Sequence, residues 1–595
     1  MKKAVGEHKK YITLIPYGIL LITILVFFNS INNDFIHLDD PEYVLQNEQL
    51  KSLSFQNISK IFSSYTHGHY QPLSVLTYAI DYSIYGLNAY GFRMTNILLH
   101  LINILLVFVF IRRLSGRFYV AVVVSLLFAV HPLRVESVVW ISERKDVLYA
   151  VFYFSALICY LNYLEKNKSV KYILLAGLFF ILALFSKSMA VSLPIVFFLI
   201  DWYKKRKYRI RLVIEKIPFL ILSIVFGIIV INSQQSSGLL EDTLASFTFF
   251  DRVFLSSYSA VIYIFKVFVP FNTLFMTDYP NRIDGHLPIY FYIAPIFIGL
   301  ISVLIYKVRI FRRELVFGLF FYLITISLVL QIIPVSGFLW DHYTYVPSVG
   351  ILFIIGQFLG YVQDRRFSYA HKLKGPLTTI MVFFVLMLVV VTWNRNNIWK
   401  NSGSLFSEVI RLNPDNEAAY INRGLYLLEQ GDYKQAENDF SQAIKVKDYM
   451  SVAWLNRGQV RVELKKYEEA MKDMDQAIKL DPSENAHLVR GKLKADLGYH
   501  QKAIEDFNRA FKLNNHSSKA LNNIGLSLAK LEKYNDALEY FNKAIKINPG
   551  NASAYGNRGT LYYQTGNKQK ACTDWQRSAE LGNKRANQIF LKYCK

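Results

Sequence analysis

Two adjacent carboxylates, Asp39 and Asp40, are the first residues of the chain whose types and spacing could do chemistry. Neighbouring acids can bind a divalent cation such as Mg²⁺ or Mn²⁺. Alternatively, one acid can be held ionised as a base toward a hydroxyl group while the other tunes its pKa. The plain alternative is a solvated turn before Pro41. Because the pair closely follows an apolar stretch long enough to cross a bilayer, residues 11–28, the rest of the chain must decide between these interpretations.

The composition indicates a membrane protein with a soluble part. Of the 595 residues, 53% are hydrophobic, and most charged residues follow Asn394. The net charge is +23, but many Lys and Arg residues form short clusters between apolar stretches, where membrane topology explains them, so we expect no nucleic-acid partner. The three cysteines form no disulfide framework and no zinc motif; Cys572 and Cys594 can pair, although their spacing favours two separate thiols.

Charge counting predicts about eleven membrane crossings. Lysines before residue 11 and the cluster 204–207 are expected to be cytoplasmic. Stretch 253–269 would reverse this pattern if it crossed, so we expect it to be re-entrant or interfacial. The first crossing places Asp39 and Asp40 outside the cytoplasm, and the odd total number of crossings places everything after Trp393 there as well. The expected crossings are 11–28, 95–111, 118–130, 147–164, 172–185, 189–202, 212–231, 289–305, 315–333, 346–362 and 377–392.

Several cations fall on the predicted outer face, where cations are rare. They are Arg93, Arg134, Arg144, Lys145 and Lys187. Arginine can bind phosphate through two hydrogen bonds and lysine acts as a point charge, so the group predicts a phosphate site at the outer leaflet. Lys187 has no acid beside it in the sequence. The alternative is that these cations pair with the acids interspersed among them, Glu136, Glu143 and Asp146; His131 and His342 are candidate proton carriers.

The C-terminal part of the sequence contains a repeated pattern of small residues. Gly424, Gly458, Gly491, Gly525 and Gly559 recur every 33 or 34 residues, and each is followed twelve residues later by alanine. This period is typical of tetratricopeptide repeats (TPRs), in which small residues let the two helices of a unit touch. We expect repeats at about 417–450, 451–484, 485–517, 518–551 and 552–585, followed by a capping helix.

Two sets of repeat residues have different expected roles. The aromatic residues Phe440, Phe507, Phe541 and Trp575 are expected to be core. Asn422, Asn456, Asn522 and Asn557 are candidates for peptide contact in the concave groove, with plain surface as the alternative. Because this part contains no metal, nucleophile or phosphate motif, we expect it to bind partners and not to catalyse.

Four blocks resemble the transmembrane-and-tetratricopeptide proteins. They are Asp39-Asp40, Tyr70-Gln71-Pro72-Leu73 with 86–88 and 96–100, the block 128–146, and 343–350. That group is similar to O-mannosyltransferases with a multi-span GT-C fold. The resemblance implies a polyprenyl-phosphate-sugar donor, inverting transfer to a hydroxyl, and a catalytic or metal-binding role for Asp39 and Asp40. One departure is His342, where the family pattern has arginine before Tyr343.

These observations predict an all-α protein: a polytopic membrane helical bundle, residues 1–394, a connector, 395–416, and a TPR solenoid, 417–595. The predicted function is transfer of a sugar from a polyprenyl-phosphate donor to hydroxyls of exported proteins, with an acceptor or partner protein on the repeats. The alternative is a non-catalytic membrane scaffold. The expected location is a bacterial inner membrane, in contact with membrane lipid, with the repeats periplasmic. The expected donor phosphate-binding residues are Arg144, Lys145, Lys187, Arg134, Arg93 and His342.

Overall fold

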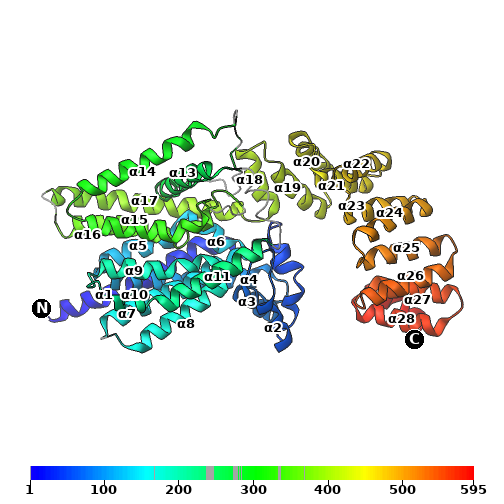
Figure 1. The fold of residues 1–595 in the computed structure, drawn as a ribbon, viewed down its shortest axis with the longest axis horizontal. Helices are drawn as coiled ribbons and strands as arrows, with labels where there is room; N and C mark the ends of the chain where they lie inside the picture. The colour runs from blue at the N-terminus through cyan, green and yellow to red at the C-terminus, as the bar shows by residue number, and fades with distance from the viewer. Residues whose placement is uncertain are drawn as a thin grey trace. The chain divides into compact units, whose positions relative to one another are not determined.

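The computed structural model describes residues 2–166, 168–235, 247–271, 279–280, 282, 285–332, 337–366 and 369–594, with side chains from residue 14 on. Within these ranges the chain is helical and has no strand. It divides into two units, Met1–Leu412 and Asn413–Lys595 (Figure 1). The predicted all-α class is confirmed.

Unit 1 is a bundle of helices. Its α-helices are α1 (Lys2–Phe27), α2 (Phe55–Ser63), α3 (Pro72–Tyr85), α4 (Ala89–Ser115), α5 (Phe118–Val130), α6 (Val135–Val139), α7 (Arg144–Glu165), α8 (Val170–Ser186), α9 (Leu193–Tyr203), α10 (Ile210–Ile214), α11 (Ile217–Gln235), α13 (Phe249–Phe268), α14 (Ile289–Lys307), α15 (Arg312–Ile326), α16 (Ser348–Gln363), α17 (Ala370–Ile398) and α18 (Ser402–Leu412). The short 3-10 or π helices are η1 (Phe28–Ser30), η2 (Pro41–Leu45), η3 (Glu48–Lys51), η4 (Pro132–Arg134), η5 (Ile141–Glu143), η6 (Ser188–Ser192), η7 (Ser327–Val329) and η8 (Asp341–Thr344).

Many of these helices are apolar enough for a membrane. In the described part of the chain, five are long enough to cross one: Ala89–Ser115, Ile141–Glu165, Ile210–Gln235, Ile289–Lys307 and Ala370–Ile398. A sixth candidate is the pair Phe118–Val130 and Pro132–Val139, bent by 62°. Shorter apolar helices cover Leu14–Ser30, Val170–Ser186, Ser188–Tyr203 and Ser348–Gln363. Every expected crossing except 315–333 therefore corresponds to a candidate span or a shorter apolar helix.

Two expected membrane segments lie outside these candidate spans. Stretch 315–333, of which residues 315–332 are described, holds α15, which begins with Arg312, Arg313 and Glu314 and, at 15 residues, is shorter than a helix that crosses a bilayer. Residues 253–268 belong to α13, an unbroken 20-residue helix that is not among the candidate spans, and its re-entrant or interfacial position stays a prediction. A capping box between Thr248 and Asp251 starts α13, which explains why this helix begins four residues before the apolar stretch.

The bend after α5 has a local cause. His131 is extended and Pro132 begins η4, so the helical hydrogen-bond pattern stops there. The chain then makes the short helices η4, α6 and η5 before α7 begins at Arg144. This irregular segment is fully buried, which positions its polar side chains inside the bundle.

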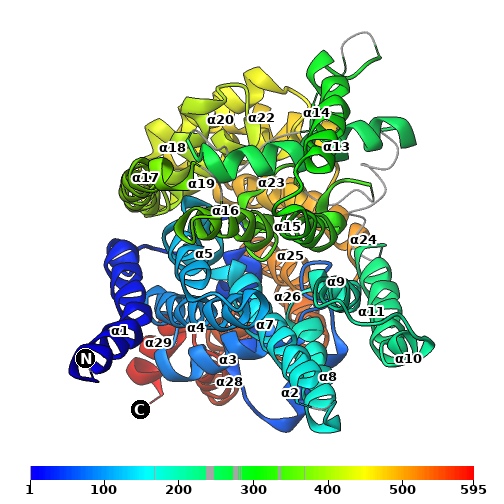
Figure 2. The ribbon, with the colours of Figure 1, turned by 90° about the vertical axis from the view of Figure 1, so that its left-hand side faces the viewer.

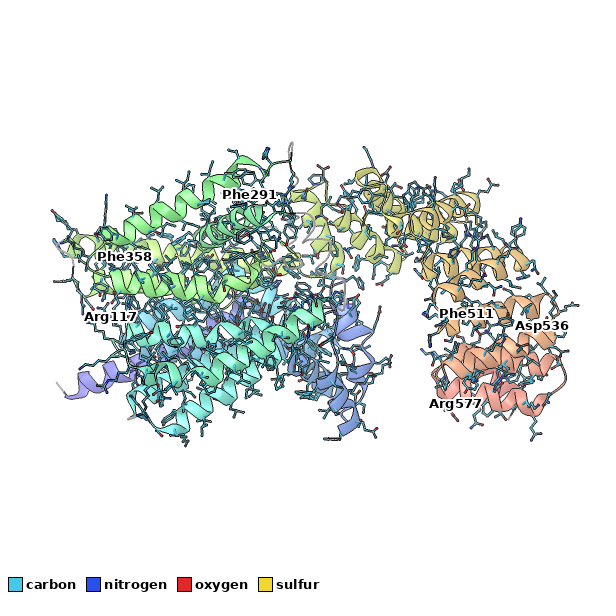
Figure 3. The ribbon with its side chains drawn as sticks, viewed as in Figure 1. Arg117, Phe291, Phe358, Phe511, Asp536 and Arg577 are labelled. Atoms are coloured by element: carbon cyan, nitrogen blue, oxygen red, sulfur yellow. A yellow bond between two sulfur atoms is a disulfide. The ribbon has the colours of Figure 1, made fainter. Side chains whose placement is uncertain are left out.

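The basic clusters gather at one end of unit 1. Arg113 pairs with Glu165 at 3.1 Å, and Lys204 Nζ donates to the carbonyl of Arg113 at 2.8 Å. Arg117 pairs with Asp364 at 3.6 Å, and Figure 3 labels Arg117 near this end of the bundle. Helix α7 packs against α4 and α8 (Figure 2). It leads from the buried segment that ends at Glu143 to Glu165, the partner of Arg113. Its 22 residues span about 33 Å.

Unit 2 consists of helix pairs followed by a single helix. The helices are α19 (Glu417–Glu429), α20 (Tyr433–Val446), α21 (Ser451–Glu463), α22 (Tyr467–Leu480), α23 (Glu484–Asp496), α24 (His500–Leu513), α25 (Ser518–Lys530), α26 (Tyr534–Ile547), α27 (Ala552–Gln564), α28 (Lys568–Glu580) and α29 (Lys584–Tyr593). The pairs α19–α20 to α27–α28 correspond to the five predicted repeats, and α29 to the predicted capping helix.

The repeated glycines lie where the two helices of each repeat meet. A Cβ on Gly491 would approach a ring carbon of Phe507 to 2.6 Å, and one on Gly525 would approach Phe541 to 2.8 Å. The four aromatic residues predicted as core are all buried. Small residues therefore allow the close helix contact, as the period indicates.

Cys572 and Cys594 form a disulfide, so the expectation of two separate thiols is wrong. Helix α29 packs against α28, which brings two residues 22 positions apart in sequence to a Cα–Cα distance of 5.6 Å. That distance lies in the range a disulfide needs. Sequence spacing alone does not reveal this approach, since the reversal between the two helices creates it.

Candidate functional site

A cavity of about 300 Å³ lies at the end of unit 1 opposite the basic clusters. It is lined by acidic, basic, histidine and aromatic side chains from segments far apart in the sequence. The polar and aromatic lining residues are Asp39, His67, His69, Tyr70, Gln71, Trp140, Glu143, Lys145, Lys187, Ser188, Gln234, Trp340, His342 and Tyr343. Of the residues predicted for the site, the structure brings Asp39, Lys145, Lys187 and His342 to this cavity.

The two adjacent acids have different positions. Asp39 lines the cavity, with Oδ2 3.9 Å from Nζ of Lys145. Asp40 is completely buried, and its two oxygens accept the backbone N–H groups of Ile36 at 2.8 Å and Ser142 at 2.9 Å. Asp40 thus fastens the first loop to η5, which turns Asp39 toward the cavity. Asp40 does not line the cavity, so the structure does not present the two carboxylates together to a ligand there.

Arg93 also holds the first loop in place. It is fully buried in α4, and its guanidinium donates to the carbonyls of Val139 at 3.0 Å, Asp34 at 3.0 Å, and Asn33. Its hydrogen-bonding groups face protein carbonyls and not the cavity. The structure therefore assigns Arg93 a structural position instead of the predicted phosphate contact.

Three other predicted residues are likewise engaged by the protein. Arg134 donates to the carbonyl of Tyr345 at 2.7 Å and to Ser348 at 3.0 Å. Arg144 pairs with Asp81 at 2.5 Å. His131 contacts the carbonyl of Val267 through Nε2 at 2.9 Å. All three side chains are buried and none lines the cavity, because each serves to join helices.

The two cavity lysines lie in a cluster of acids. Lys145 Nζ is 2.8 Å from Oε1 of Glu143. Lys187 Nζ is 2.5 Å from Oδ1 of Asp146 and 3.6 Å from Oε2 of Glu143. The alternative that outer cations pair with neighbouring acids therefore describes both lysines. Each ammonium nevertheless remains at the cavity wall, where a phosphate oxygen could add to its partners.

A buried charge network extends from the cavity. His342 Nδ1 lies 3.2 Å from Oε2 of Glu136, and its Nε2 lies 3.7 Å from Oε2 of Glu143. Glu136 is 3.4 Å from Arg395, which pairs with Asp341 at 2.5 Å. Lys266 completes the network, 2.6 Å from Asp341. Glu136 and Asp146 thus position other charges, and neither lines the cavity.

Burial sets the protonation of the loop residues at the cavity. It raises the pKa of Asp39, although Lys145 opposes this shift. It lowers the pKa of His69 to about 3, with Lys145 adding to the effect. It also lowers the pKa of His342 to about 3, against the opposing influence of Glu143. Both histidines are therefore neutral at physiological pH, so His342 can offer a hydrogen bond but not the positive charge predicted for it.

One group of side chains has the composition of a metal site. Ligand atoms of Glu143, Asp146 and His342 all lie within 4.8 Å of one another. The ammonium of Lys187, however, contacts both carboxylates of this group. A lysine already neutralises the acids there, so a divalent cation would have to displace it.

Sequence reasoning missed several cavity residues. His67 and His69 lie between α2 and α3, and Trp340 comes from the segment before η8. Trp140 and Trp340 stack with ring centroids 5.6 Å apart. The signal that could have found the histidines is the polar, histidine-rich sequence 66–71 within the long first outer loop.

The predicted groove asparagines are partly used within the solenoid. Asn422 donates to the carbonyl of Ala418 at 2.8 Å, and Asn557 donates to Oδ1 of Asn522 at 2.9 Å. Asn456 is half-buried. More regular is an ion pair that sequence reasoning missed, between the residue before the repeat glycine and an aspartate 16 positions later. It joins Arg423–Asp439, Arg457–Asp473, Arg490–Asp506 and Arg558–Asp574.

Fold and site together define a class of protein: a helical membrane domain with a cavity lined by charged and aromatic side chains, followed by a tetratricopeptide solenoid. Residues 70–232 match the dolichyl-phosphate-mannose-protein mannosyltransferase family. Tetratricopeptide families match 404–448, 421–485, 455–517, 518–551 and 540–573. The predicted resemblance is confirmed, since this chain combines a region that matches a mannosyltransferase family with tetratricopeptide repeats.

The curated relatives that the chain matches carry the name protein O-mannosyl-transferase. The chain is 24% identical over 446 residues to protein O-mannosyl-transferase F38B6.6 of Caenorhabditis elegans, covering 71% of this chain and 61% of that protein. It is 22% identical over 461 residues to protein O-mannosyl-transferase TMTC3 of Homo sapiens, covering 69% and 49%. It is 34% identical over 169 residues to TMTC4 of Mus musculus, covering 25% and 22%. The chain thus spans about three fifths or less of these relatives' length.

Two tetratricopeptide-type solved structures resemble a part of this chain. YrrB, described as a TPR protein with an unusual peptide-binding site, is 22% identical, with a TM-score of 0.26 over 32% of this chain and 99% of that one. MamA is 24% identical, with a TM-score of 0.25 over 28% and 96%. At these TM-scores neither likeness supports an argument of its own.

Proposed function

We propose that this chain is a membrane glycosyltransferase that moves mannose from a polyprenyl-phosphate donor to hydroxyl groups of exported proteins. The observation that carries the proposal is the cavity in which Asp39 meets Lys145 and Lys187. The match of residues 70–232 supports it independently, because that region contains Lys145 and Lys187 and much of the cavity wall. The relatives' names support mannose as the sugar.

The cavity residues have distinct roles in this reaction. The acceptor oxygen attacks the anomeric carbon and gives its proton to the carboxylate of Asp39. The bond from that carbon to the phosphate oxygen breaks, and the phosphate takes the electron pair. Lys145 and Lys187 face the charge that develops on the leaving phosphate. The attack comes from the face opposite the leaving group, so the configuration inverts.

Burial of Asp39 favours this role. A carboxylate whose pKa is raised holds a proton more readily than a solvated one, which makes it a better general base near neutral pH. Lys145, 3.9 Å away, opposes this rise in the pKa of Asp39 and so favours the ionised form. Asp40, by its two backbone contacts, positions Asp39 and does not touch the substrate.

The aromatic wall suits a sugar. Trp140, Trp340 and Tyr343 line the cavity beside the lysines. Flat rings that present an apolar face can cover the C–H groups of a hexose, while the charged groups hold its polar end. Two hydrophobic residues of the lining, Val230 and Val329, suit the first isoprene unit of the donor.

The proposal places the cavity and the repeats outside the cytoplasm. The basic clusters lie at the other end of unit 1, as the positive-inside rule requires of a cytoplasmic end. The Cys572–Cys594 disulfide supports an oxidising compartment for the repeats. We infer a bacterial inner membrane, with the repeats in the periplasm holding the acceptor or a partner protein.

The test is mannose transfer by the purified full chain in lipid nanodiscs, with a polyprenyl-phosphate-mannose donor and a serine- and threonine-rich peptide. Asp39→Asn should lower kcat by about 10²-fold or more, because a general base is lost. Asp34→Asn, an exposed acid of the same loop, is the matched control and should keep the parent rate.

Two results would contradict the proposal. Parent-like turnover by Asp39→Asn would remove Asp39 from the chemistry. A folded parent chain without transfer to any hydroxyl acceptor would instead support the scaffold alternative, in which the outer charges only pair with one another.

A further inference from the structure

A second cavity lies at the end of unit 1 that carries the basic clusters. It measures about 470 Å³ and is formed where α7 ends and α9 connects to α10. Its lining is dominated by cations and completed by three leucines and one acid. The lining residues are Leu161, Leu164, Glu165, Lys168, Lys204, Arg206, Lys207, Arg209, Arg211 and Leu212.

The cations of this second cavity outnumber the available acids. Glu165, the acid in its wall, pairs with Arg113, and Glu215 pairs with Arg206 at 2.7 Å and Arg211 at 3.4 Å. Among the residues that the structure describes, no ion pair engages Lys168, Lys207 or Arg209. The cavity therefore presents uncompensated positive charge, which an anion would neutralise.

The surroundings place this charge at the level of lipid headgroups. The cavity lies between the ends of two candidate spans, Ile141–Glu165 and Ile210–Gln235. Beside it, Tyr208 is 84% exposed and Ile210 is 75% exposed. Large apolar side chains that remain uncovered next to basic ones are typical of an element that lies in the membrane interface.

The leucines give the second cavity an apolar floor. Leu161 and Leu212 are buried at its base, so the cationic rim stands above a hydrocarbon-like surface. A neighbouring cavity of about 780 Å³ shares Arg206 and Leu212 and adds Lys205 and Arg313. The basic surface thus continues around the 204–212 segment.

The geometry points to a binding site for the headgroup of an anionic phospholipid. The phosphate would contact Lys207, Arg209 and Arg211, and the start of an acyl chain would cover Leu161 and Leu212. This site is separate from the Asp39 cavity, because the length of α7, about 33 Å, lies between them. It does not depend on the proposed transfer reaction.

Lipid binding to the purified full chain tests the inference. The chain, freed of lipid in mild detergent, is titrated with dioleoyl phosphatidylglycerol or dioleoyl phosphatidylcholine, and bound lipid is counted by native mass spectrometry. Phosphatidylglycerol should bind at least about tenfold more tightly. The triple variant Lys207→Gln, Arg209→Gln, Arg211→Gln should lose most of this preference.

The matched control removes equal charge from the same end of the bundle. Lys307→Gln, Arg309→Gln, Lys372→Gln changes three exposed cations that do not line the cavity and should keep the preference. Equal binding of the two lipids by the parent chain would overturn the inference without any variant. Inorganic phosphate that displaces phosphatidylglycerol at equal concentration would show a site for a soluble anion and would overturn it as well.

Discussion

Nζ of Lys187 lies 2.5 Å from Oδ1 of Asp146, although the two residues are 41 positions apart in the sequence. The side chain of Lys187 is 10% exposed and that of Asp146 is fully buried. The cation that lacks an acid beside it in sequence therefore has a partner in space. Any donor phosphate must share Lys187 with this pair.

Removal of the Lys187 charge should lower both the free energy of unfolding and the rate of mannose transfer, and a second substitution should separate the two effects. Lys187→Met leaves Asp146 buried without its partner, so we expect a loss of about 3–5 kcal/mol in the free energy of unfolding. Adding Asp146→Asn removes the stranded charge and should restore much of that loss. Transfer should remain impaired in the double variant, because the phosphate contact is still missing.

Thermal unfolding and mannose transfer, measured on the same nanodisc samples, check this prediction. Lys187→Arg is the charge-conserving control. Recovery of transfer together with stability in the double variant would show that Lys187 serves the fold alone.

The acid limb of the pH–rate profile should report Asp39. Burial raises its pKa above the usual value of about 3.9, and the base must be ionised to accept a proton. The kcat/KM for transfer should therefore fall on acidification with a midpoint above that of a solvated aspartate. The profile of Asp34→Asn should keep this limb, whereas residual transfer by Asp39→Asn should lack it.

The elements could be predicted from the sequence much better than the site. Helix ends and repeats follow from local signals such as Gly116 at the left-handed C-cap of α4, or the periodic glycines that contact rings such as Phe507. Those signals act within a few turns of chain. Which of Asp39 and Asp40 lines the cavity cannot be predicted from such local signals. It depends on which carboxylate accepts the N–H of Ser142, about a hundred residues away in the sequence.

The cations predicted for the phosphate site show the same limit of prediction from sequence. Arg93 and Lys145 both have the charge and the position in sequence of a phosphate ligand. Only tertiary packing turns the Arg93 guanidinium onto backbone carbonyls and leaves the Lys145 ammonium at a cavity wall. Charge counting could thus find the correct end of the bundle, but not the side chains that face the cavity.

Asp40 should make stability depend on pH in the opposite sense to a salt-bridged acid. Burial raises its pKa to about 6 in the folded chain, against about 3.9 when unfolded. The folded state then holds the proton more tightly than the unfolded state does. The stabilisation that protonated Asp40 gives the folded state is therefore complete below about pH 4 and is lost as pH rises through 6. This loss amounts to about 3 kcal/mol in the free energy of unfolding.

Asp40→Asn should abolish this dependence, because the amide does not titrate. Its NH₂ group would also face one of the two backbone N–H donors, which should cost about 1–3 kcal/mol at acid pH. The measurement is the unfolding temperature between pH 4 and 7, with the variant compared to the parent chain at each pH. A difference in unfolding temperature between variant and parent that stays constant from pH 4 to pH 7 would contradict a raised pKa of Asp40.

The disulfide between Cys572 and Cys594 makes the location of the repeats chemically testable. The bridge closes a loop of about the length for which an entropy model gives roughly 3 kcal/mol, so α29 should become less stable on reduction.

Alkylation counts the free thiols. Chain isolated from membranes without reductant, then unfolded and alkylated, should take up one alkyl group, on Cys159, the buried free thiol of α7. After reduction it should take up three. Cys159→Ser is the control, since it should abolish uptake before reduction and leave two groups after it. Uptake of three groups without reductant would mean that the repeats face a reducing compartment, and the Asp39 cavity could then not share its side of the membrane with an acceptor held by the solenoid.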